Sequence, residues 1–241
     1  MKLPIEDVLD AHKSAVLDSL APAMQTNRFL AELIFEYIRA GGLKSIEILD
    51  IGCVTGTLEL DLCLIQQIKS IIAVNSNKCL TNIAKGRYRA SQIYQVGCQF
   101  INLDRAESLL NPGASHDVIL YRTADRDIQS DLDMQDVLYR GILPYLKPEG
   151  LLILTFPRQP AVLGLLLAHH RYFGFWPALA AGFRITSITL ALRLLGRKPT
   201  RGWKPSDDFL RKLHPRADIK KIGDSIIMII GNNQHLRLEK F

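Results

Sequence analysis

Acidic residues are missing from a long stretch of this 241-residue sequence. No Asp or Glu occurs between Leu151 and Ser206, while eight Arg or Lys residues do. The formal net charge of the chain is +6, so the rest of the sequence is slightly acidic and the basic character belongs to this one stretch. The same stretch is also the most apolar part of the chain.

Paired cysteines and a secretory leader are lacking as well. The four cysteines stand singly, with no CxxC motif, at Cys53, Cys63, Cys79 and Cys98. This spacing fits reduced thiols better than a disulfide framework or a zinc site. The first residues, MKLPIEDVLDAHK, do not have the basic start and continuous apolar run of a secretory signal. We therefore expect a cytoplasmic protein.

Long uninterrupted apolar runs are also missing. The apolar residues of the acid-free stretch are interrupted by His169, His170, Arg171 and Arg184. No uninterrupted apolar segment therefore reaches the roughly twenty residues of a membrane-spanning helix. Adjacent histidines do not share one face of a helix, which disfavours a metal site at His169 and His170.

The composition of the acid-free stretch leaves two interpretations open. Phe, Trp and Leu together with Arg are typical of an interfacial helix on an anionic membrane surface, peripheral to the bilayer. The alternative is a lid whose apolar faces are buried over a substrate pocket, with or without membrane contact. A nucleic-acid surface is disfavoured because the stretch is too aliphatic for a phosphate-tracking stripe.

Helical patterns and short apolar runs make up the rest of the chain. Residues at helical spacing predict two helices in the first forty residues, interrupted at Pro22 and ending at Gly41 and Gly42. Continuous apolar runs predict strands at 46–51, 71–74, 95–101, 117–121 and 151–156, and helical patterns predict helices at 57–68, 77–89 and 132–143. Such an alternation predicts an α/β fold with a doubly wound, mostly parallel sheet.

The C-terminal part predicts a different arrangement. The stretch SDDFLRKLHP reads as a helix capped by its first serine, and strands at 219–222 and 225–230 are joined by a tight turn, which predicts an antiparallel pair. We expect four segments: N-terminal helices (1–42), an α/β core (43–157), an apolar basic helical insert or lid (158–205), and a C-terminal helix with the strand pair (206–241).

A glycine turn follows the first predicted strand in IEILDIGCVTGTLEL, residues 46–60. In an open parallel sheet ligands bind beyond the carboxyl ends of the strands, where glycines permit positive φ and close approach of the backbone. The following helix offers free N–H groups at its N-terminus. The third glycine of the dinucleotide motif GxGxxG is missing, which disfavours a nicotinamide-dependent reductase.

The order of motifs around this turn resembles class I S-adenosylmethionine-dependent methyltransferases. LDIGCVTGTLEL is similar to their glycine motif, IIAVNSNKCLTNIAKGR to their second strand and helix, FINLDRAESL to the third-strand loop, and HDVILYR to the fourth strand. VLYRGILPYLKPEGLLILTFPR resembles the helix, turn and fifth strand, so the likeness covers about residues 45–157, and DIKKIGDSIIMIIG resembles the reversed C-terminal pair. The resemblance implies S-adenosyl-L-methionine as cofactor and a seven-stranded sheet with an antiparallel C-terminal strand.

The resemblance also implies which residues hold the cofactor. It places Asp50, Gly52, Cys53 and Gly56 at the methionine end, Asn75 at the ribose, Asp104 and Arg105 at the adenine, and backbone at Tyr121 and Arg122 by the methyl group.

Two positions depart from the family pattern. Val54 replaces a middle glycine, so either it adopts an ordinary φ with its side chain pointing away or the pocket is partly filled. Asn75 replaces an acid, which weakens ribose binding by ~1 kcal/mol, about fivefold in affinity.

Catalysis in such enzymes asks mainly for alignment of the acceptor, because the sulfonium is already an activated methyl donor. The candidates for a base are His116, Asp125 and Asp127; the alternatives are an exposed histidine before a strand and a solvated acidic loop. We expect methyl transfer to a small, hydrophobic or amphipathic acceptor. The alternative is a catalytically silent module that contacts a membrane or protein partner through residues 158–205.

Overall fold

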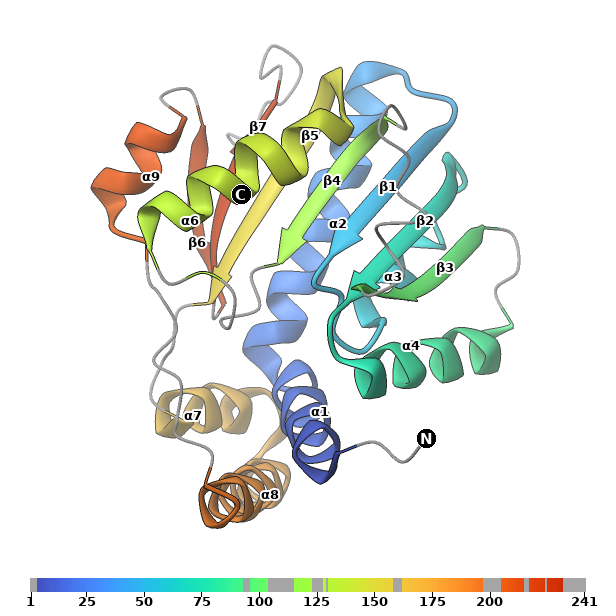
Figure 1. Cartoon of the computed structure of the whole chain (residues 1–241). Helices are drawn as coiled ribbons and strands as arrows, with labels where there is room; N and C mark the ends of the chain where they lie inside the picture. Colours follow the sequence, from blue (N-terminus) through green and yellow to red (C-terminus); the bar gives the residue numbers. More distant parts are fainter. Residues whose placement is uncertain are drawn as a thin grey trace.

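A single seven-stranded sheet forms the centre of the computed structural model (Figure 1). The structure describes residues 4–92, 96–103, 115–122, 128, 130–157, 162–196, 205–214, 217–223 and 225–231. The strands are β1 (Ile46–Ile51), β2 (Ile68–Asn75), β3 (Gly97–Asn102), β4 (His116–Arg122), β5 (Leu146–Pro157), β6 (Asp218–Ile222) and β7 (Ser225–Ile230). Their order is β3-β2-β1-β4-β5-β7-β6, and β7 runs antiparallel to both of its neighbours. The predicted mostly parallel, doubly wound sheet with a reversed C-terminal strand is confirmed.

The helices largely follow the predicted pattern. They are α1 (Ile5–Asp18), α2 (Ala21–Gly41), α3 (Thr57–Leu62), α4 (Lys78–Ser91), α6 (Asp131–Asp136), α7 (Val162–Phe173), α8 (Phe175–Leu194) and α9 (Asp207–Leu213). α6 continues through a π-helical turn (Val137–Ile142) and a 3-10 turn (Leu143–Tyr145). Pro22 lies in the first turn of α2, where its missing N–H costs nothing, instead of in a break.

One predicted helix is too long. The helical pattern at 57–68 ends at Leu62 in the structure, and β2 begins at Ile68. Ile68 pairs with Ile46 at the start of β1, so the chain has to straighten early enough to join the parallel sheet. Sheet pairing therefore overrides the local helical spacing of the intervening apolar residues.

Helices cover both faces of the sheet, and this explains the continuous apolar strands. Alternate residues of one strand face opposite sides: Ile48 packs with residues of α2 and α3, and Leu49 with residues of α6 and α9. Both side chains are fully buried. A strand buried on both faces has no polar side, as parallel sheets require.

A separate group of helices lies beyond the carboxyl ends of β4 and β5 (Figure 1). It consists of α1, α7 and α8, held together by a small apolar cluster around Leu20, Leu165 and Ile185. By length and composition α8 is able to cross a membrane, contrary to the expectation from its interrupted apolar runs.

The two adjacent histidines of α7 point to different surroundings. His169 is buried, and its Nδ1 accepts a hydrogen bond from the backbone N–H of Ala21, 3.3 Å away, in the first turn of α2. His170 is exposed and meets Phe175 edge-on, with 6.3 Å between ring centroids. Among the residues that the structure describes, no group of three or more His, Cys, Asp or Glu could hold a metal ion.

Candidate functional site

The glycine turn lies where the strand order reverses. β1 is hydrogen-bonded to β2 on one side and to β4 on the other. From β1 the chain first adds β2 and β3 on one side, and then adds β4 and β5 on the other. The turn leaves the carboxyl end of β1 and leads into α3. Ligands of open parallel sheets bind at such switch points, so this edge is the candidate site.

Both glycines of the turn have backbone conformations that a side chain would oppose. Gly52 has φ +93°, and a Cβ added there would lie 2.0 Å from the carbonyl oxygen of Arg122. Gly56 has φ +79° at the start of α3, and a Cβ there would lie 3.0 Å from the Cβ of Ala84. The two glycines let β1 and α3 approach β4 and α4, so the packing of the turn itself requires them.

Val54 occupies the middle of the turn without backbone strain. Gln92 is the one non-glycine residue with positive φ in the part of the chain that the structure describes. Val54 therefore has an ordinary φ, which is the backbone part of the first of the two alternatives for this position. Its side chain is half-buried.

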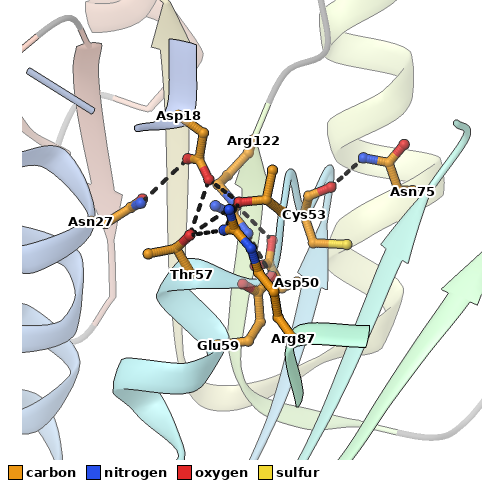
Figure 2. A network of polar contacts seen from close by, with 10 residues as sticks. Asp18, Asn27, Asp50, Cys53, Thr57, Glu59, Asn75, Arg87 and Arg122 are labelled. Atoms are coloured by element: carbon orange, nitrogen blue, oxygen red, sulfur yellow. Dashed lines mark hydrogen bonds and ion pairs between the residues drawn. The ribbon is translucent and has the colours of Figure 1, made fainter. Parts of the chain in front are cut away.

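A buried ion cluster lies under the turn (Figure 2). Arg122, at the end of β4, donates from Nε to Oδ1 of Asp50 at 3.1 Å and from Nη2 to the other Asp50 oxygen. The same Nη2 donates to Oε1 of Glu59 in α3 at 2.6 Å. The side chain of Arg122 is 11% exposed and those of Asp50 and Glu59 are 0% exposed. The cluster ties together the ends of β1 and β4 and the start of α3.

Two carboxyl groups share one guanidinium in this cluster. Burial lowers the pKa of Arg122, but the carboxylates of Asp50 and Glu59 outweigh burial and hold that pKa above its ordinary value. Burial raises the pKa of Glu59 well above its ordinary value, against the opposing effect of Arg122. Oε2 of Glu59 has no hydrogen-bond partner among the described residues. The cluster thus joins one guanidinium to two carboxyl groups, and the pKa of the Glu59 carboxyl is the one that burial raises.

A second polar network joins helix α1 to the turn (Figure 2). Thr57 donates to Oδ2 of Asp18 at 3.1 Å, and Thr55 donates to the same oxygen. Arg87 of α4 donates from Nη1 to both threonine hydroxyls, at 2.6 Å for Thr55 and 2.8 Å for Thr57. Asn27 of α2 lies 3.5 Å from the other Asp18 oxygen. The last residue of α1 therefore holds the C-terminal half of the glycine turn.

Both ends of the Asn75 amide are engaged by backbone groups, one in the glycine turn and one just before α4. It lies at the end of β2, and its Nδ2 donates to the carbonyl of Cys53 while its Oδ1 accepts from the N–H of Asn77 at 2.6 Å. The residue is buried. An amide suits this position because it supplies one donor and one acceptor, whereas a carboxylate supplies acceptors alone.

Backbone groups of the turn are also committed to the sheet. The N–H groups of Gly52 and Cys53 both donate to the carbonyl of Val74, at 2.8 and 3.2 Å. The thiol of Cys53 is buried, and burial raises its pKa. Tyr121, next to Arg122 on β4, is partly buried against the apolar cluster that contains Leu49. Six of the expected cofactor residues, Asp50, Gly52, Cys53, Gly56, Asn75 and Arg122, thus come together at one edge of the sheet.

The other expected residues are Tyr121, which neighbours Arg122 at the same end of β4, and five residues that the structure does not place at the turn or does not describe. Asp104, Arg105, Asp125 and Asp127 lie outside the residues that the structure describes. His116 is the first residue of β4, at the opposite edge of the sheet from Arg122 and the turn. The expectation that His116 is exposed is wrong: it is buried, and burial lowers its pKa. The structure does not bring His116 to the candidate site.

Sequence reasoning missed Asp18, Glu59 and Arg87, although two of them carry a detectable signal. An acid in the last turn of a helix opposes the helix dipole, so Asp18 at the end of α1 indicates a partner outside that helix. Glu59 stands beside Leu58 in the apolar face of α3, and a buried carboxyl requires a cation or a proton. Arg87 lies on an exposed turn of α4 and carries no such signal.

Comparison with known proteins identifies the fold. No family model matches the sequence, and no curated protein matches it. Among solved structures, the CurJ carbon methyltransferase superposes with a TM-score of 0.55 at 14% identity, over 90% of this chain and 56% of that chain. The N-methyltransferase NodS from Bradyrhizobium japonicum WM9, in complex with S-adenosyl-L-homocysteine, gives 0.52 at 11% identity, over 90% and 91%.

A third neighbour, monomeric WbdD, gives a TM-score of 0.52 at 13% identity over 86% of this chain, but this chain spans 41% of WbdD. These likenesses and the sheet order show that the chain has the fold of class I S-adenosylmethionine-dependent methyltransferases. Identities this low establish the architecture, and the function of a fold depends on the chemistry of its site.

Proposed function

We propose that this protein transfers a methyl group from S-adenosyl-L-methionine to a small hydrophobic or amphipathic acceptor. The observation that carries the proposal is the position of the glycine turn, at the switch point between β1 and β4 with Asp50, Asn75 and Arg122 around it. A neighbour of the same fold is in complex with S-adenosyl-L-homocysteine, the compound that remains after methyl transfer.

The charge of the site fits this cofactor. S-adenosylmethionine carries a sulfonium and an ammonium, and the carboxyl groups of Asp50 and Glu59 balance Arg122 so that the cluster does not repel a cation. Oε2 of Glu59 also lacks a partner among the described residues. In this proposal Asp50, Gly52, Cys53 and Gly56 hold the methionine end.

The other proposed contacts follow the remaining strand ends. Asn75 lies beside the ribose, Asp104 and Arg105 beside the adenine, and the backbone at Tyr121 and Arg122 faces the reacting methyl. Bound cofactor supplies an activated methyl group, so the protein has to align the acceptor and exclude water. α1, α7 and α8 lie beyond the carboxyl ends of β4 and β5, where they are placed to cover an acceptor (Figure 1).

A catalytically silent module is the second candidate, and one observation favours it. The amide of Asn75 is engaged on both sides by the protein's own backbone, at Cys53 in the turn and at Asn77 just before α4. A side chain engaged in this way holds the loop without any ligand. In this second reading the fold serves as a scaffold for the insert.

Transfer of a labelled methyl group tests the proposal. The protein is incubated with methyl-labelled S-adenosylmethionine and, separately, with a lipid extract and a soluble extract of cells. We expect label in a small product that partitions into organic solvent. No labelled product in either extract would favour the silent module.

Two glycine variants serve as the matched pair for this assay. Gly52→Ala places a Cβ 2.0 Å from the Arg122 carbonyl and should abolish transfer. Gly86→Ala adds a Cβ on α4 that meets nothing within 4 Å and should leave transfer intact. Equal activity of both variants would show that the turn is not the catalytic site.

A further inference from the structure

Helix α8 has an inner apolar stripe that packs against the rest of the protein. Ala178, Ile185 and Leu192 recur seven residues apart and are all buried. Ile185 belongs to the cluster with Leu20 and Leu165, next to α1 and α7. This stripe is what an ordinary surface helix needs to stay attached to its domain.

The same helix has a second apolar stripe that faces solvent. Its members are spaced three, four, seven and four residues apart, so they share one helix face: Trp176, Leu179, Phe183, Leu190 and Leu194. Trp176 and Phe183 are each 74% exposed and Leu194 is 80% exposed. Trp176 precedes Ala178 by two residues and Phe183 precedes Ile185 by two, which is a rotation of about 200° around the helix. The outer stripe therefore lies opposite the inner one.

Aromatic residues at the α7–α8 junction extend the outer stripe. Tyr172, Phe173 and Phe175 are all exposed. Phe175 contacts the Trp176 ring edge-on, with 5.4 Å between centroids. A surface helix of a soluble domain has polar residues on its outer face, and a contiguous exposed apolar patch marks an interaction surface. We call the residues of this patch, 172–176 with Leu179, Phe183, Leu190 and Leu194, the outer surface.

The charges that α7 and α8 themselves carry beside the outer surface are all positive. Arg171, Arg184 and Arg193 are exposed, and no Asp or Glu occurs between residues 151 and 206. None of these three arginines forms an ion pair within the described part of the structure. An occupant of this surface must therefore combine apolar contact with negative charge.

We propose that the outer surface docks on an anionic lipid bilayer, with α8 lying in the plane of the interface. Trp176 and Phe183 enter the boundary between headgroups and acyl chains, and the arginines contact lipid phosphates. Because α7 and α8 lie beyond the carboxyl ends of β4 and β5, docking turns this edge of the sheet toward the bilayer (Figure 1). The proposal is independent of methyl transfer.

Two other occupants of the outer surface fit the observations less well. A second copy of the chain would bring its own Arg184 and Arg193 close to those of the first copy, and the segment has no acid to neutralise them. A membrane-spanning α8 would have to leave α1 and expose Leu20 and Leu165, which the inner stripe keeps buried. An anionic lipid surface satisfies the charge and keeps the inner stripe in place.

Vesicle co-sedimentation tests the proposal with the full chain. The probes are vesicles of equal parts phosphatidylcholine and phosphatidylglycerol, and vesicles of phosphatidylcholine alone. We expect the wild type to sediment with the anionic vesicles and to be released by high salt, because salt screens the arginine contacts. Absence of binding to the anionic vesicles at low salt would overturn the proposal.

Variants separate the apolar and the charged contributions. Trp176→Ser combined with Phe183→Ser should reduce partitioning roughly tenfold or more, since it removes the two largest inserted side chains. Arg184→Gln and Arg193→Gln should each lower binding to anionic vesicles roughly fivefold and leave binding to neutral vesicles unchanged. Leu64→Ser and Leu132→Ser are the controls, because these side chains are 69% and 75% exposed but lie elsewhere. Equal losses in the controls would overturn the proposal.

Two further measurements distinguish the other occupants. Sedimentation velocity without lipid should give a monomer, and a dimer that Trp176→Ser with Phe183→Ser dissociates would assign the surface to a second copy. Washing wild-type membranes with alkaline carbonate should release the protein, and retention would assign α8 as a spanning helix. Circular dichroism of each variant should match the wild type, because the substituted side chains are exposed.

Discussion

The guanidinium of Arg122 donates hydrogen bonds to two carboxyl groups that are fully buried. Asp50 and Glu59 come from different elements, and both are fully buried against the same Arg122 nitrogen. Burial of charge is costly unless the charges are paired, so the three side chains act as one unit. Removing the shared cation should therefore affect the fold before it affects any ligand.

We expect Arg122→Met to lower the free energy of unfolding by about 3 kcal/mol, because two buried carboxyls lose their partner. Urea denaturation measures the difference. Arg140→Met is the control: its ion pair with Asp136 is on the surface, with the Arg140 side chain 84% exposed, and such pairs contribute little. A loss no larger than that of the control would contradict the role assigned to Arg122.

Asn75 is the residue at which a family-like substitution should do harm. Restoring the acid with Asn75→Asp removes the donor to the Cys53 carbonyl and sets a carboxylate against that oxygen. We expect a loss of about 2 kcal/mol in stability, measured by urea denaturation, and no gain in affinity for S-adenosylmethionine. Asn82→Asp makes the same change of charge on an exposed position of α4 and should be nearly neutral. Tighter cofactor binding by Asn75→Asp would show that position 75 contacts the ribose in preference to the turn.

At the scale of elements, the C-terminal end of helix α1 holds the glycine turn through hydrogen bonds. Its last residue, Asp18, accepts hydrogen bonds from Thr55 and Thr57, which lie on the far side of β1 in the sequence. The same end of α1 packs through Leu17 and Leu20 into the cluster that holds α8. The end of α1 thus contacts both the glycine turn and the cluster that holds α8.

Loss of the hydrogen bonds from Thr55 and Thr57 to Asp18 should make the glycine turn open more often. We expect Asp18→Ala to speed amide hydrogen exchange in residues 53–60 and at the end of α1, with little change in β5 and β7. Asp18→Asn retains one acceptor oxygen and should have a smaller effect. Unchanged exchange in residues 53–60 of Asp18→Ala would contradict the role of Asp18 in holding the turn.

The contact between α7 and α2 should respond to pH through His169. Burial lowers the pKa of His169, whose Nδ1 must stay unprotonated to accept from Ala21. The unfolded chain takes up this proton first as pH falls through about 6.5, so stability contributed by neutral His169 is present above that pH and lost below it.

We therefore expect the melting temperature of the wild type to fall between about pH 7 and pH 5 more steeply than that of His169→Gln. His116 has a pKa lowered by burial too, so the variant should retain part of the slope. His170→Gln is the control, because His170 is exposed and should leave the slope unchanged. Parallel curves for the wild type and His169→Gln would contradict the assignment.

The elements themselves were largely predictable, whereas their cross-contacts were not. The strand at 46–51 was predicted with its observed bounds because burial on both faces leaves a mostly apolar segment, with Ile46, Ile48, Leu49 and Ile51. The helix at 57–68 was predicted too long because a local pattern does not reveal that Ile68 pairs with Ile46.

In the site, the glycine turn was predicted from a local motif. The partners of that turn, Asp18 and Glu59 in particular, were not predicted, because the contacts from Asp18 to Thr57 and from Arg122 to Glu59 join residues 39 and 63 positions apart. One sequence carries no record of such pairings.

At the scale of the whole molecule, the helices that carry the outer surface and the candidate site lie toward the same edge of the sheet. The carboxyl ends of the parallel strands carry the glycine turn, and α1, α7 and α8 lie beyond them (Figure 1). A protein with this arrangement is suited to meet an amphipathic acceptor at a surface. Its central requirement is that the turn binds a nucleoside cofactor at all.

Isothermal titration of the purified protein with S-adenosyl-L-methionine tests this requirement most directly. The account predicts saturable heat with a dissociation constant in the micromolar range, which Gly86→Ala retains and Gly52→Ala loses while both variants remain folded. Absence of heat from the folded wild type at millimolar ligand would contradict it.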